Sequence, residues 1–250
     1  MPETNDERDS AAGSAPAPGE PTADRVRGIF SLIADRYDLF NILSSFGIDR
    51  TWRRAAVQAA NLKTSSRVID LCAGTGDLSL ALARQGRPAE VIGTDFVPEM
   101  LAVAEQKARG FEGRTKVSFS VADAQDLPFP DSSFDVATVA FGVRNLPDRA
   151  ANFAEVVRVL KPGGRYVILE FSRPSFAPWR WFYHLYLRVV IPAIGGLLTR
   201  DRASFVYLND SIRSFPPQAQ LAAELRAAGF TAITWEDRTG GIVAIHTAVK

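Results

Sequence analysis

The sequence predicts an α/β fold, in which a mostly parallel sheet of seven strands carries helices on both faces and has an antiparallel strand at one edge. Three observations support this fold. Short apolar runs alternate with segments of helical periodicity between residues 67 and 171. Two further strand-like runs, residues 230–236 and 241–249, follow closely on each other, as antiparallel neighbours do. A glycine loop, DLCAGTGD at residues 70–77, follows the first apolar run.

The segments before the first strand are predicted to form a tail and a lid. Residues 1–22 are rich in Pro, Ala, Ser, Gly and acidic residues and contain no aromatic residue. Such a segment cannot bury enough surface to offset its chain entropy, so we expect it to be disordered. Residues 23–62 are expected to form a helical lid on a single domain that spans residues 23–250. Helical spacing is clear at the start of this segment, in Val26, Ile29, Phe30 and Ile33.

Strands and helices then alternate. The predicted strands are residues 67–72, 90–95, 116–123, 134–141 and 165–171. The helices expected between them are residues 77–85, 97–110 and 148–160. Pro98 lies near the first turn of the second helix, where proline is favoured. KPGG, at residues 161–164, is expected to turn the chain into the fifth strand.

An aromatic insertion, residues 174–215, interrupts this alternation. Its first part is expected to form a turn-rich aromatic cluster of Trp179, Trp181, Phe182, Tyr183 and Tyr186. The apolar run VVIPAIGGLL that follows is too short to span a bilayer, and Pro192 interrupts it. A lid that packs on the sheet is one interpretation. A peripheral membrane contact through residues 174–198 is another, because Trp and Tyr favour the membrane interface and Arg180 and Arg188 can meet lipid head groups.

The last part of the chain is predicted to return to the sheet. Pro216 and Pro217 begin a helix in which Leu221 and Leu225 share a face, and Gly229 ends it. The two antiparallel strands follow this helix.

The glycine loop and two acidic residues indicate a nucleoside site. Gly74 and Gly76 allow a tight turn, and the N–H groups of the following helix favour an anionic group. The third glycine of a dinucleotide fingerprint is replaced by Ser79, which weakens a pyrophosphate interpretation. Asp95 ends the second strand, where an acid can bind ribose hydroxyls, and Asp123 ends the third, where it can accept from an adenine amino group. The combination suits S-adenosylmethionine; the alternative is that these residues only form turns and helix caps.

Composition narrows the remaining classes of function. The formal net charge of +1 gives no electrostatic attraction to nucleic acid, so no nucleic-acid partner is expected. Cys72 is the only cysteine, and it is interpreted as a small core residue. His184 and His246 are far apart in the chain, so no metal site is predicted. His184 is expected to be a hydrogen-bonded packing residue, and His246 a structural residue of an edge strand. No signal peptide is recognised, and a cytoplasmic location is expected.

Several stretches resemble a known family. DLCAGTGD, TDFVPEML, VADAQDLPF and RVLKPGGRYVILEFS are similar to motifs of class I S-adenosylmethionine-dependent methyltransferases, whose fold is Rossmann-like. YDLFNILSSFGIDRTW and RVLKPGGRYVILEFS resemble the two signatures of the ubiquinone/menaquinone biosynthesis C-methyltransferase family, and FGVRN resembles another of its segments. The likeness covers residues 25–250.

This chain departs from the family pattern at five positions. Phe40 stands where the family usually has Met, Ser44 where an apolar residue is usual, and Asp49 where it usually has His. Tyr166 replaces an aliphatic residue, and Ala140 stands where relatives often have a serine that touches the cofactor.

The resemblance implies S-adenosylmethionine as cofactor and a set of residues that bind it. Its cofactor contacts fall on Thr75, Asp95, Asp123 and Ala124, and Ala140 can offer only its backbone. Together with the loop residues Asp70, Gly74 and Gly76, they form the expected cofactor site.

The resemblance also implies C-methylation of a prenylated quinol, and the expected reaction is demethylmenaquinol to menaquinol. A 2-polyprenyl-6-methoxy-1,4-benzoquinol, another lipophilic aromatic substrate, or a binding module without catalysis are the alternatives. Arg144 and Asn145 are expected to face the transferred methyl group, with Arg144 stabilising a phenolate, and Tyr37 and Asn41 to bond the ring oxygens. The alternatives are a structural ion pair for Arg144 and polar anchors of the lid for Tyr37 and Asn41. A substrate of this kind extends the expected location to the inner face of the membrane, as a peripheral contact.

Overall fold

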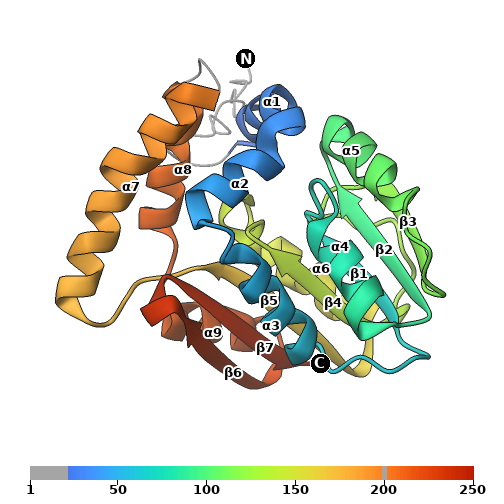
Figure 1. The fold of residues 1–250 in the computed structure, drawn as a ribbon. Coiled ribbons are helices and arrows are strands. Elements are labelled where there is room, and N and C mark those ends of the chain that lie inside the picture. The colour runs from blue at the N-terminus through green and yellow to red at the C-terminus, as the bar shows by residue number, and fades with distance from the viewer. Residues whose placement is uncertain (1–21, 199–201) are drawn as a thin grey trace, which may run out of the picture.

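One mixed sheet of seven strands organises the computed structural model, which describes residues 22–198 and 202–250 (Figure 1). The order is β3-β2-β1-β4-β5-β7-β6, with β1 to β5 parallel and β7 antiparallel to both of its neighbours. The strands are β1 (Arg67–Leu71), β2 (Glu90–Asp95), β3 (Lys116–Val121), β4 (Phe134–Ala140), β5 (Leu160–Phe171), β6 (Thr231–Arg238) and β7 (Val243–Val249). The predicted α/β fold is confirmed.

The two faces of the sheet are covered by different helices, because neighbouring residues of a strand point to opposite sides. Val68 of β1 joins an apolar cluster with α3 (Asp49–Ala59) and α4 (Asp77–Ala81). Ile69, the next residue, joins the opposite cluster with α6 (Arg149–Val159) and α9 (Gln218–Ala227). The remaining helix of the parallel half, α5 (Pro98–Ala108), packs against β2 and β3.

Four helices stand beyond the carboxyl ends of the parallel strands (Figure 1). They are α1 (Ala23–Ile33), α2 (Tyr37–Ser45), α7 (Ala177–Leu198) and α8 (Arg202–Ser214). Phe40 of α2, Tyr183 of α7 and Ile212 of α8 share one buried cluster, which joins the N-terminal helices to the aromatic insertion. The third N-terminal helix, α3, instead packs on a face of the sheet. Of the tail predicted at residues 1–22, all but Thr22 lies outside the described residues.

The insertion is more regular than the sequence predicted. Its first part was expected to be a turn-rich cluster, but it is one helix, α7. This helix also continues through Pro192, which was expected to interrupt the apolar run. Proline removes one helical hydrogen bond. The buried side chains of Leu187 and Ile191 pack in the shared cluster next to the proline, which holds the helix on its neighbours. No helix in the described parts of the chain is long and apolar enough to cross a membrane.

Two other elements differ from the expectation. β5 begins at Leu160, so KPGG belongs to the strand and not to a turn before it. The pairing of β5 with β4 shifts register between Phe134 and Val136, and Gly163 has a left-handed φ of 75°. These features are typical of a β-bulge, which accommodates the extra residues without ending the strand. The helix after the glycine loop stops at Ala81 and continues as a π-turn over Leu82–Gly86.

The two C-terminal strands are antiparallel neighbours, as predicted, but β6 is the outermost strand and β7 lies between β5 and β6. His246 of β7 therefore lies in an interior strand and not at the edge. Its side chain is buried, and Nε2 lies 3.1 Å from the carbonyl oxygen of Gln218. Most side chains of β6 are exposed, which suits an outer strand, whereas those of β7 are mostly buried.

A buried polar contact suggests a test of the fold. Asn152 of α6 donates through Nδ2 to the carbonyl oxygen of Ala124 at 2.7 Å, and its Oδ1 accepts from the hydroxyl of Tyr166 at 3.3 Å. The Tyr166 ring also stacks on Phe230, with ring centroids 5.6 Å apart.

Asn152→Ala should lower the free energy of unfolding by about 2–4 kcal/mol, because it leaves a buried carbonyl and a buried hydroxyl without partners and opens a cavity. Tyr166→Phe keeps the stacked ring and removes one long hydrogen bond, so it should cost about 1 kcal/mol or less. Urea unfolding of both variants measures the difference. Equal losses would show that the amide network does not hold the segment around Ala124.

Candidate active site

Three small cavities follow one another along the carboxyl ends of β1, β2 and β4. Their volumes are about 50, 30 and 30 Å³, and Cys72 lines all three. In open α/β sheets, this edge is where ligands bind, because the strand order changes direction between β1 and β4. We call these cavities the cofactor cavities, because the residues that the sequence predicts to bind the cofactor line them. They are the loop cavity beside Gly74 and Thr75, the central cavity beside Met100, and the outer cavity beside Asp123.

The glycine loop is held in its shape by two different constraints. Gly74 and Gly76 have φ angles of 56° and 79°, in the left-handed region that favours glycine. A Cβ on Gly76 would also lie 2.9 Å from Cβ of Ala104. The loop therefore approaches α5 too closely for a side chain, which accounts for its second glycine.

Ser79, which replaces the third glycine of the dinucleotide fingerprint, braces the loop from below. Its Oγ donates to Asp70 Oδ2 at 2.5 Å, and Thr138 Oγ1 donates to Asp70 Oδ1 at 2.6 Å. Burial raises the pKa of Asp70 to about 6, although both hydroxyls oppose that shift. Asp70 lines the loop cavity, and its carboxylate joins β1, β4 and α4.

The other expected cofactor residues line the same row of cavities. Asp95 accepts the backbone N–H of Gly74 at 2.8 Å and that of Val97 at 3.0 Å, and burial raises its pKa. Each carboxylate oxygen keeps a further lone pair for a hydroxyl donor. Asp123 is exposed and Ala124 is buried, and both line the outer cavity.

The central and loop cavities meet at Ala140, which lines both of them. Thr75 lines the loop cavity. This row, with Asp123 at one end, Asp95 in the middle and the glycine loop at the other end, fits S-adenosylmethionine. A group with an adenosine end and an amino-acid end needs these features in this order.

A larger apolar cavity of about 340 Å³ adjoins the row and lies between the N-terminal helices, the sheet edge and the insertion. Its apolar wall includes Phe40, Trp52, Phe182, Leu187 and Ile191. Three of the four predicted catalytic residues, Tyr37, Asn41 and Arg144, line it. We call it the apolar cavity. Tyr37 and Phe141 line both this cavity and two of the cofactor cavities, so they form the wall between them.

Arg144 forms a buried ion pair with Glu170, a residue that the sequence analysis missed. Arg144 Nη1 lies 3.3 Å from Glu170 Oε1 and also donates to the carbonyl oxygen of Phe141. The backbone N–H of Arg144 donates to the other carboxylate oxygen at 3.2 Å. Burial raises the pKa of Glu170, and Arg144 opposes this shift. Like Asp95, Glu170 is an acidic residue at the carboxyl end of a parallel strand, and this position could have identified it from the sequence.

The sequence left two roles open for Arg144, a structural ion pair and a catalytic residue. Arg144 forms the ion pair, and it also lines the apolar cavity. Its Nε is buried and has no hydrogen-bond partner among the described residues. The hydroxyl of Tyr183, which lines the same cavity, is also buried and has no hydrogen-bond partner among the residues that the structure describes. An occupant of this cavity that carries oxygen atoms would satisfy both groups, since a buried unpaired donor is costly.

The other predicted catalytic residues lie close to Arg144. Burial raises the pKa of Tyr37, while the charge of Arg144 and a hydrogen bond with Asn41 lower it. Asn145 faces the cofactor cavities instead, and its Oδ1 accepts from the hydroxyl of Tyr207 at 3.2 Å. Tyr207 belongs to α8 and lines the apolar cavity, so this contact joins the insertion to the cofactor side of the wall.

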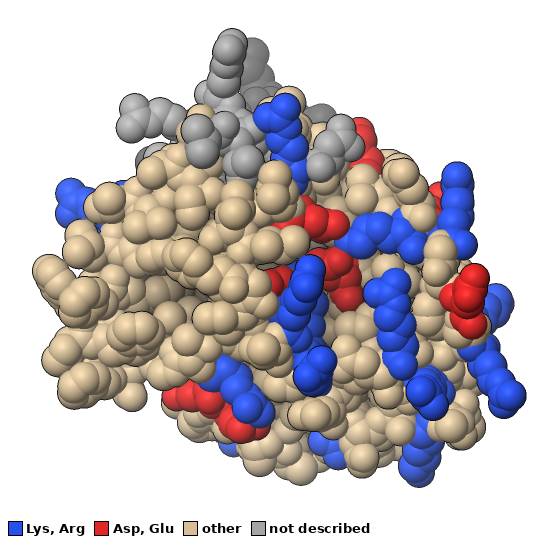
Figure 2. Space-filling model, in the orientation of Figure 1, with Lys and Arg blue, Asp and Glu red and all other residues tan. Residues whose placement is uncertain are grey.

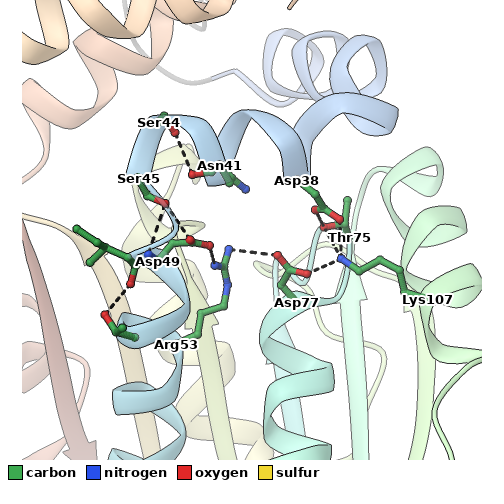
Figure 3. Close-up of polar contacts among 11 residues, drawn as sticks. Asp38, Asn41, Ser44, Ser45, Asp49, Arg53, Thr75, Asp77 and Lys107 are labelled. Carbon is green, nitrogen blue, oxygen red and sulfur yellow. Dashed lines mark hydrogen bonds and ion pairs between the residues drawn. The ribbon is translucent and has the colours of Figure 1, made fainter.

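An ionic network holds the N-terminal helices on the glycine loop (Figure 3). Asp38 of α2 accepts from Thr75 Oγ1 at 2.5 Å and from Lys107 Nζ at 2.8 Å. Lys107 also pairs with Asp77, at the start of α4. None of these three charged residues was predicted from the sequence, because they come from separate segments and only the fold brings them together.

The same network continues into α3 through Arg53, which pairs with Asp49 on the preceding turn and faces Asp77 (Figure 3). Ser45 Oγ donates to Asp49 at 2.8 Å. Asp49, Phe40 and Ser44, three positions at which the chain departs from the family pattern, all line the apolar cavity.

The two remaining residues that the sequence analysis discussed have no catalytic geometry. His184 lies outside the lining of the cavities, and its Nδ1 has no partner among the described residues, although a hydrogen bond was expected. Its ring packs beside that of Tyr183, with the ring centroids 6.1 Å apart. Cys72 is half-buried and lines the cofactor cavities, and burial raises the pKa of its thiol well above the ordinary value. A thiol of that kind is a poor nucleophile.

Comparisons with solved structures agree with this fold. The [4+2]-cyclase SpnF superposes with a TM-score of 0.68 at 21% identity, over 93% of this chain and 97% of that one. An S-adenosylmethionine-dependent methyltransferase from Thermotoga maritima, a possible histamine N-methyltransferase, gives 0.62 at 20% identity, over 89% and 98%. At such identities these likenesses show the fold alone, and they confirm the class I, Rossmann-like arrangement.

Comparisons of sequence are more specific. The model of the ubiE/COQ5 methyltransferase family matches residues 20–250. A demethylmenaquinone methyltransferase of Thermus thermophilus is 47% identical over 220 residues, which are 87% of this chain and 98% of the relative. A ubiquinone/menaquinone biosynthesis C-methyltransferase UbiE of Geobacter sulfurreducens is 42% identical, over 91% of this chain and 89% of the relative. The resemblance, the cofactor and the class of enzyme expected from the sequence are thus confirmed: the chain belongs to the ubiE/COQ5 methyltransferase family and is an S-adenosylmethionine-dependent C-methyltransferase.

Proposed function

We propose that this enzyme methylates a ring carbon of a prenylated hydroquinone, and that its substrate is demethylmenaquinol. The observation that carries the proposal is the apolar cavity of about 340 Å³, which adjoins the cofactor cavities across Tyr37 and Phe141 and is lined by Arg144. Its apolar wall suits an aromatic ring and part of a prenyl tail. The relatives named above support the same class of substrate.

The cofactor would be held by the residues that line its three cavities. Asp95 would accept hydrogen bonds from the ribose hydroxyls, and Asp123 and Ala124 would border the adenine. Gly74, Thr75 and Gly76, with Asp70 below them and Ala140 opposite, would surround the amino-acid end. When bound there, S-adenosylmethionine supplies an electrophilic methyl group.

The residues of the apolar cavity would activate the carbon that accepts this methyl group. A ring carbon is a weak nucleophile until a neighbouring hydroxyl loses its proton and its charge spreads into the ring. Arg144 would stabilise that oxyanion through its unpaired Nε, in surroundings where water is excluded. A guanidinium is always charged and has no lone pair to accept a proton, so Arg144 is unsuitable as the base itself. Tyr37 and Asn41 would form hydrogen bonds with the ring oxygens. Asn145, which lines the central cavity and accepts from Tyr207, would help to place the cofactor against the wall between the cavities.

One observation favours a second candidate function. Phe40, Ser44 and Asp49 all line the apolar cavity, although the family usually has other residues at these positions. Different side chains on the wall can select a different ring. A benzoquinol with a prenyl tail, or another lipophilic aromatic compound, is therefore the alternative substrate.

The exposed surface around the apolar cavity suggests how such a substrate reaches it. Most exposed large apolar side chains among the described residues belong to the N-terminal segment before β1 or to the insertion, and the exceptions are Val121 and Trp235. Figure 2 shows few charged side chains over α7, at the left of the view. Arg180 and Arg188 of α7 are exposed. This surface suits a peripheral contact with an anionic membrane, from which a prenylated quinol can enter.

The substrate is tested directly with labelled S-adenosylmethionine and two short-tailed quinols, a demethylmenaquinol and a demethylated benzoquinol. We expect the label on a ring carbon of the naphthoquinol, detected by mass spectrometry of the product, and at least about tenfold lower kcat/KM for the benzoquinol. A reversed preference would establish the benzoquinol alternative. If neither ring is methylated although the protein binds the cofactor, the quinol proposal fails.

Removing both charges of the buried ion pair tests the role of Arg144. Arg144→Gln alone would leave Glu170 as an uncompensated buried charge, which costs about 3–5 kcal/mol of stability. The double variant Arg144→Gln, Glu170→Gln avoids this cost. We expect its kcat to fall about 10²–10³-fold, as for the loss of an oxyanion donor, while the Kd for S-adenosylmethionine changes by less than about twofold. A normal kcat would exclude oxyanion stabilisation, and weakened cofactor binding would move Arg144 to a binding role.

Exposed residues outside the cavity lining test the membrane contact. Trp181 and Val189 of α7 are 62% and 55% exposed, and Trp235 of β6, a matched control, is 46% exposed. Trp181→Ser with Val189→Ser should reduce cosedimentation with anionic phospholipid vesicles by about tenfold or more, because it removes apolar area that would enter the interface. Trp235→Ser should leave it unchanged, and kcat on a short-tailed quinol should be normal in both variants. Wild-type protein that fails to bind such vesicles would rule out the contact.

A further inference from the structure

Arg53 lies at the junction of the apolar cavity and the loop cavity, and it lines both. It belongs to α3, and its side chain is only 9% exposed. A buried guanidinium needs partners for several N–H groups, because leaving them unsatisfied is costly. The position and burial of Arg53 therefore call for partners on both sides of the guanidinium.

The described contacts of Arg53 satisfy only one side of its guanidinium. Nη1 donates to Asp49, four residues earlier on the same helix. Nη2 lies 3.6 Å from Asp77 Oδ2, which is beyond hydrogen-bond distance. Figure 3 shows the group between Asp49 and Asp77, facing the glycine loop. Asp77 is also paired with Lys107, so it is a shared and distant partner.

The loop cavity is the one that remains for the amino-acid end of the cofactor. Asp95 lines the central and outer cavities, and Asp123 the outer one, which assigns these two to the ribose and the adenine. The amino-acid end carries a carboxylate, and Arg53 is the only Lys or Arg that lines the loop cavity among the described residues. Lys107, the nearest other cation of the network, is held by Asp38 and Asp77.

We propose that Arg53 binds the α-carboxylate of S-adenosylmethionine, and that Asp49 positions the guanidinium for this contact. A guanidinium and a carboxylate form a charge-assisted pair, which is strong in surroundings with little water. Asp49 fixes Nη1, so Nη2 is left to face the cofactor. The inference depends on the cofactor of the family and not on the identity of the quinol.

The test compares two cofactors that differ only in this group. Decarboxylated S-adenosylmethionine keeps the adenosine, the sulfonium and the amine, but has no carboxylate. By isothermal titration calorimetry, wild-type protein should bind S-adenosylmethionine at least about tenfold more tightly than the decarboxylated compound. In Arg53→Gln this preference should fall to about threefold or less, mainly because S-adenosylmethionine is bound more weakly. Arg54→Gln, an exposed neighbour on the same helix, should retain the wild-type preference.

Three results would overturn the proposal. Wild-type protein that binds both compounds equally well would show that no residue recognises the carboxylate, and this result needs no variant. Equal weakening of both compounds in Arg53→Gln would make Arg53 a structural residue. An unchanged preference in that variant would place the carboxylate elsewhere. If Arg53→Gln does not fold, Arg53→Lys keeps the charge but loses the planar donor pair, and it should show an intermediate preference. No quinol is present, so failure of the proposed function cannot produce these results.

Discussion

The buried ion pair between Arg144 and Glu170 fixes the place where the two kinds of cavity meet. Glu170 lies near the end of β5, and Arg144 follows β4, its neighbour in the sheet. The same carboxylate binds both the backbone and the side chain of Arg144, so it sets the path of the segment from Phe141 to Asn145. Phe141 then lies in the wall between the cavities, and Asn145 lies on the cofactor side. A buried pair of this kind adds little stability by itself, and its value here is the placement of a fixed donor.

The ionic network on the glycine loop has a related effect at the other side of the wall. Asp38, Lys107, Asp77 and Arg53 connect α2 and α3 with α4 and α5. The helices that cover the apolar cavity are thus attached to the loop that surrounds the cofactor. A cofactor that engages the loop would therefore act on the same helices that cover the substrate. In the proposed function, the positions of both reactants would depend on a small number of charged side chains. Interactions between charges are strongest where water is excluded.

The sequence predicted the parts of the molecule that are encoded locally. Asp95 and Asp123 follow strands, and parallel strands bring their carboxyl ends to one edge, so their place beside the row of small cavities could be predicted from the sequence. Glu170 also lies at the carboxyl end of a parallel strand, but it was not predicted as a site residue, because the residues around it in β5 are apolar. Arg53, Asp77 and Lys107 could not be inferred in this way, because their contacts join segments that are far apart in the chain. Pro192 was misleading for a similar reason: packing of Leu187 and Ile191 on other helices outweighs its local preference.

The central claim is that the quinol ring occupies the apolar cavity, with one oxygen at Arg144 and the ring facing the cofactor across Tyr37 and Phe141. A crystal structure of the enzyme with S-adenosylhomocysteine and a short-tailed demethylnaphthoquinol tests it most directly. We expect electron density for the ring within this cavity, an oxygen within hydrogen-bond distance of Arg144 Nε, and the tail along Phe182 and Leu187. Density for the ring at any other place on the protein, with this cavity filled by solvent or side chains, would contradict the account.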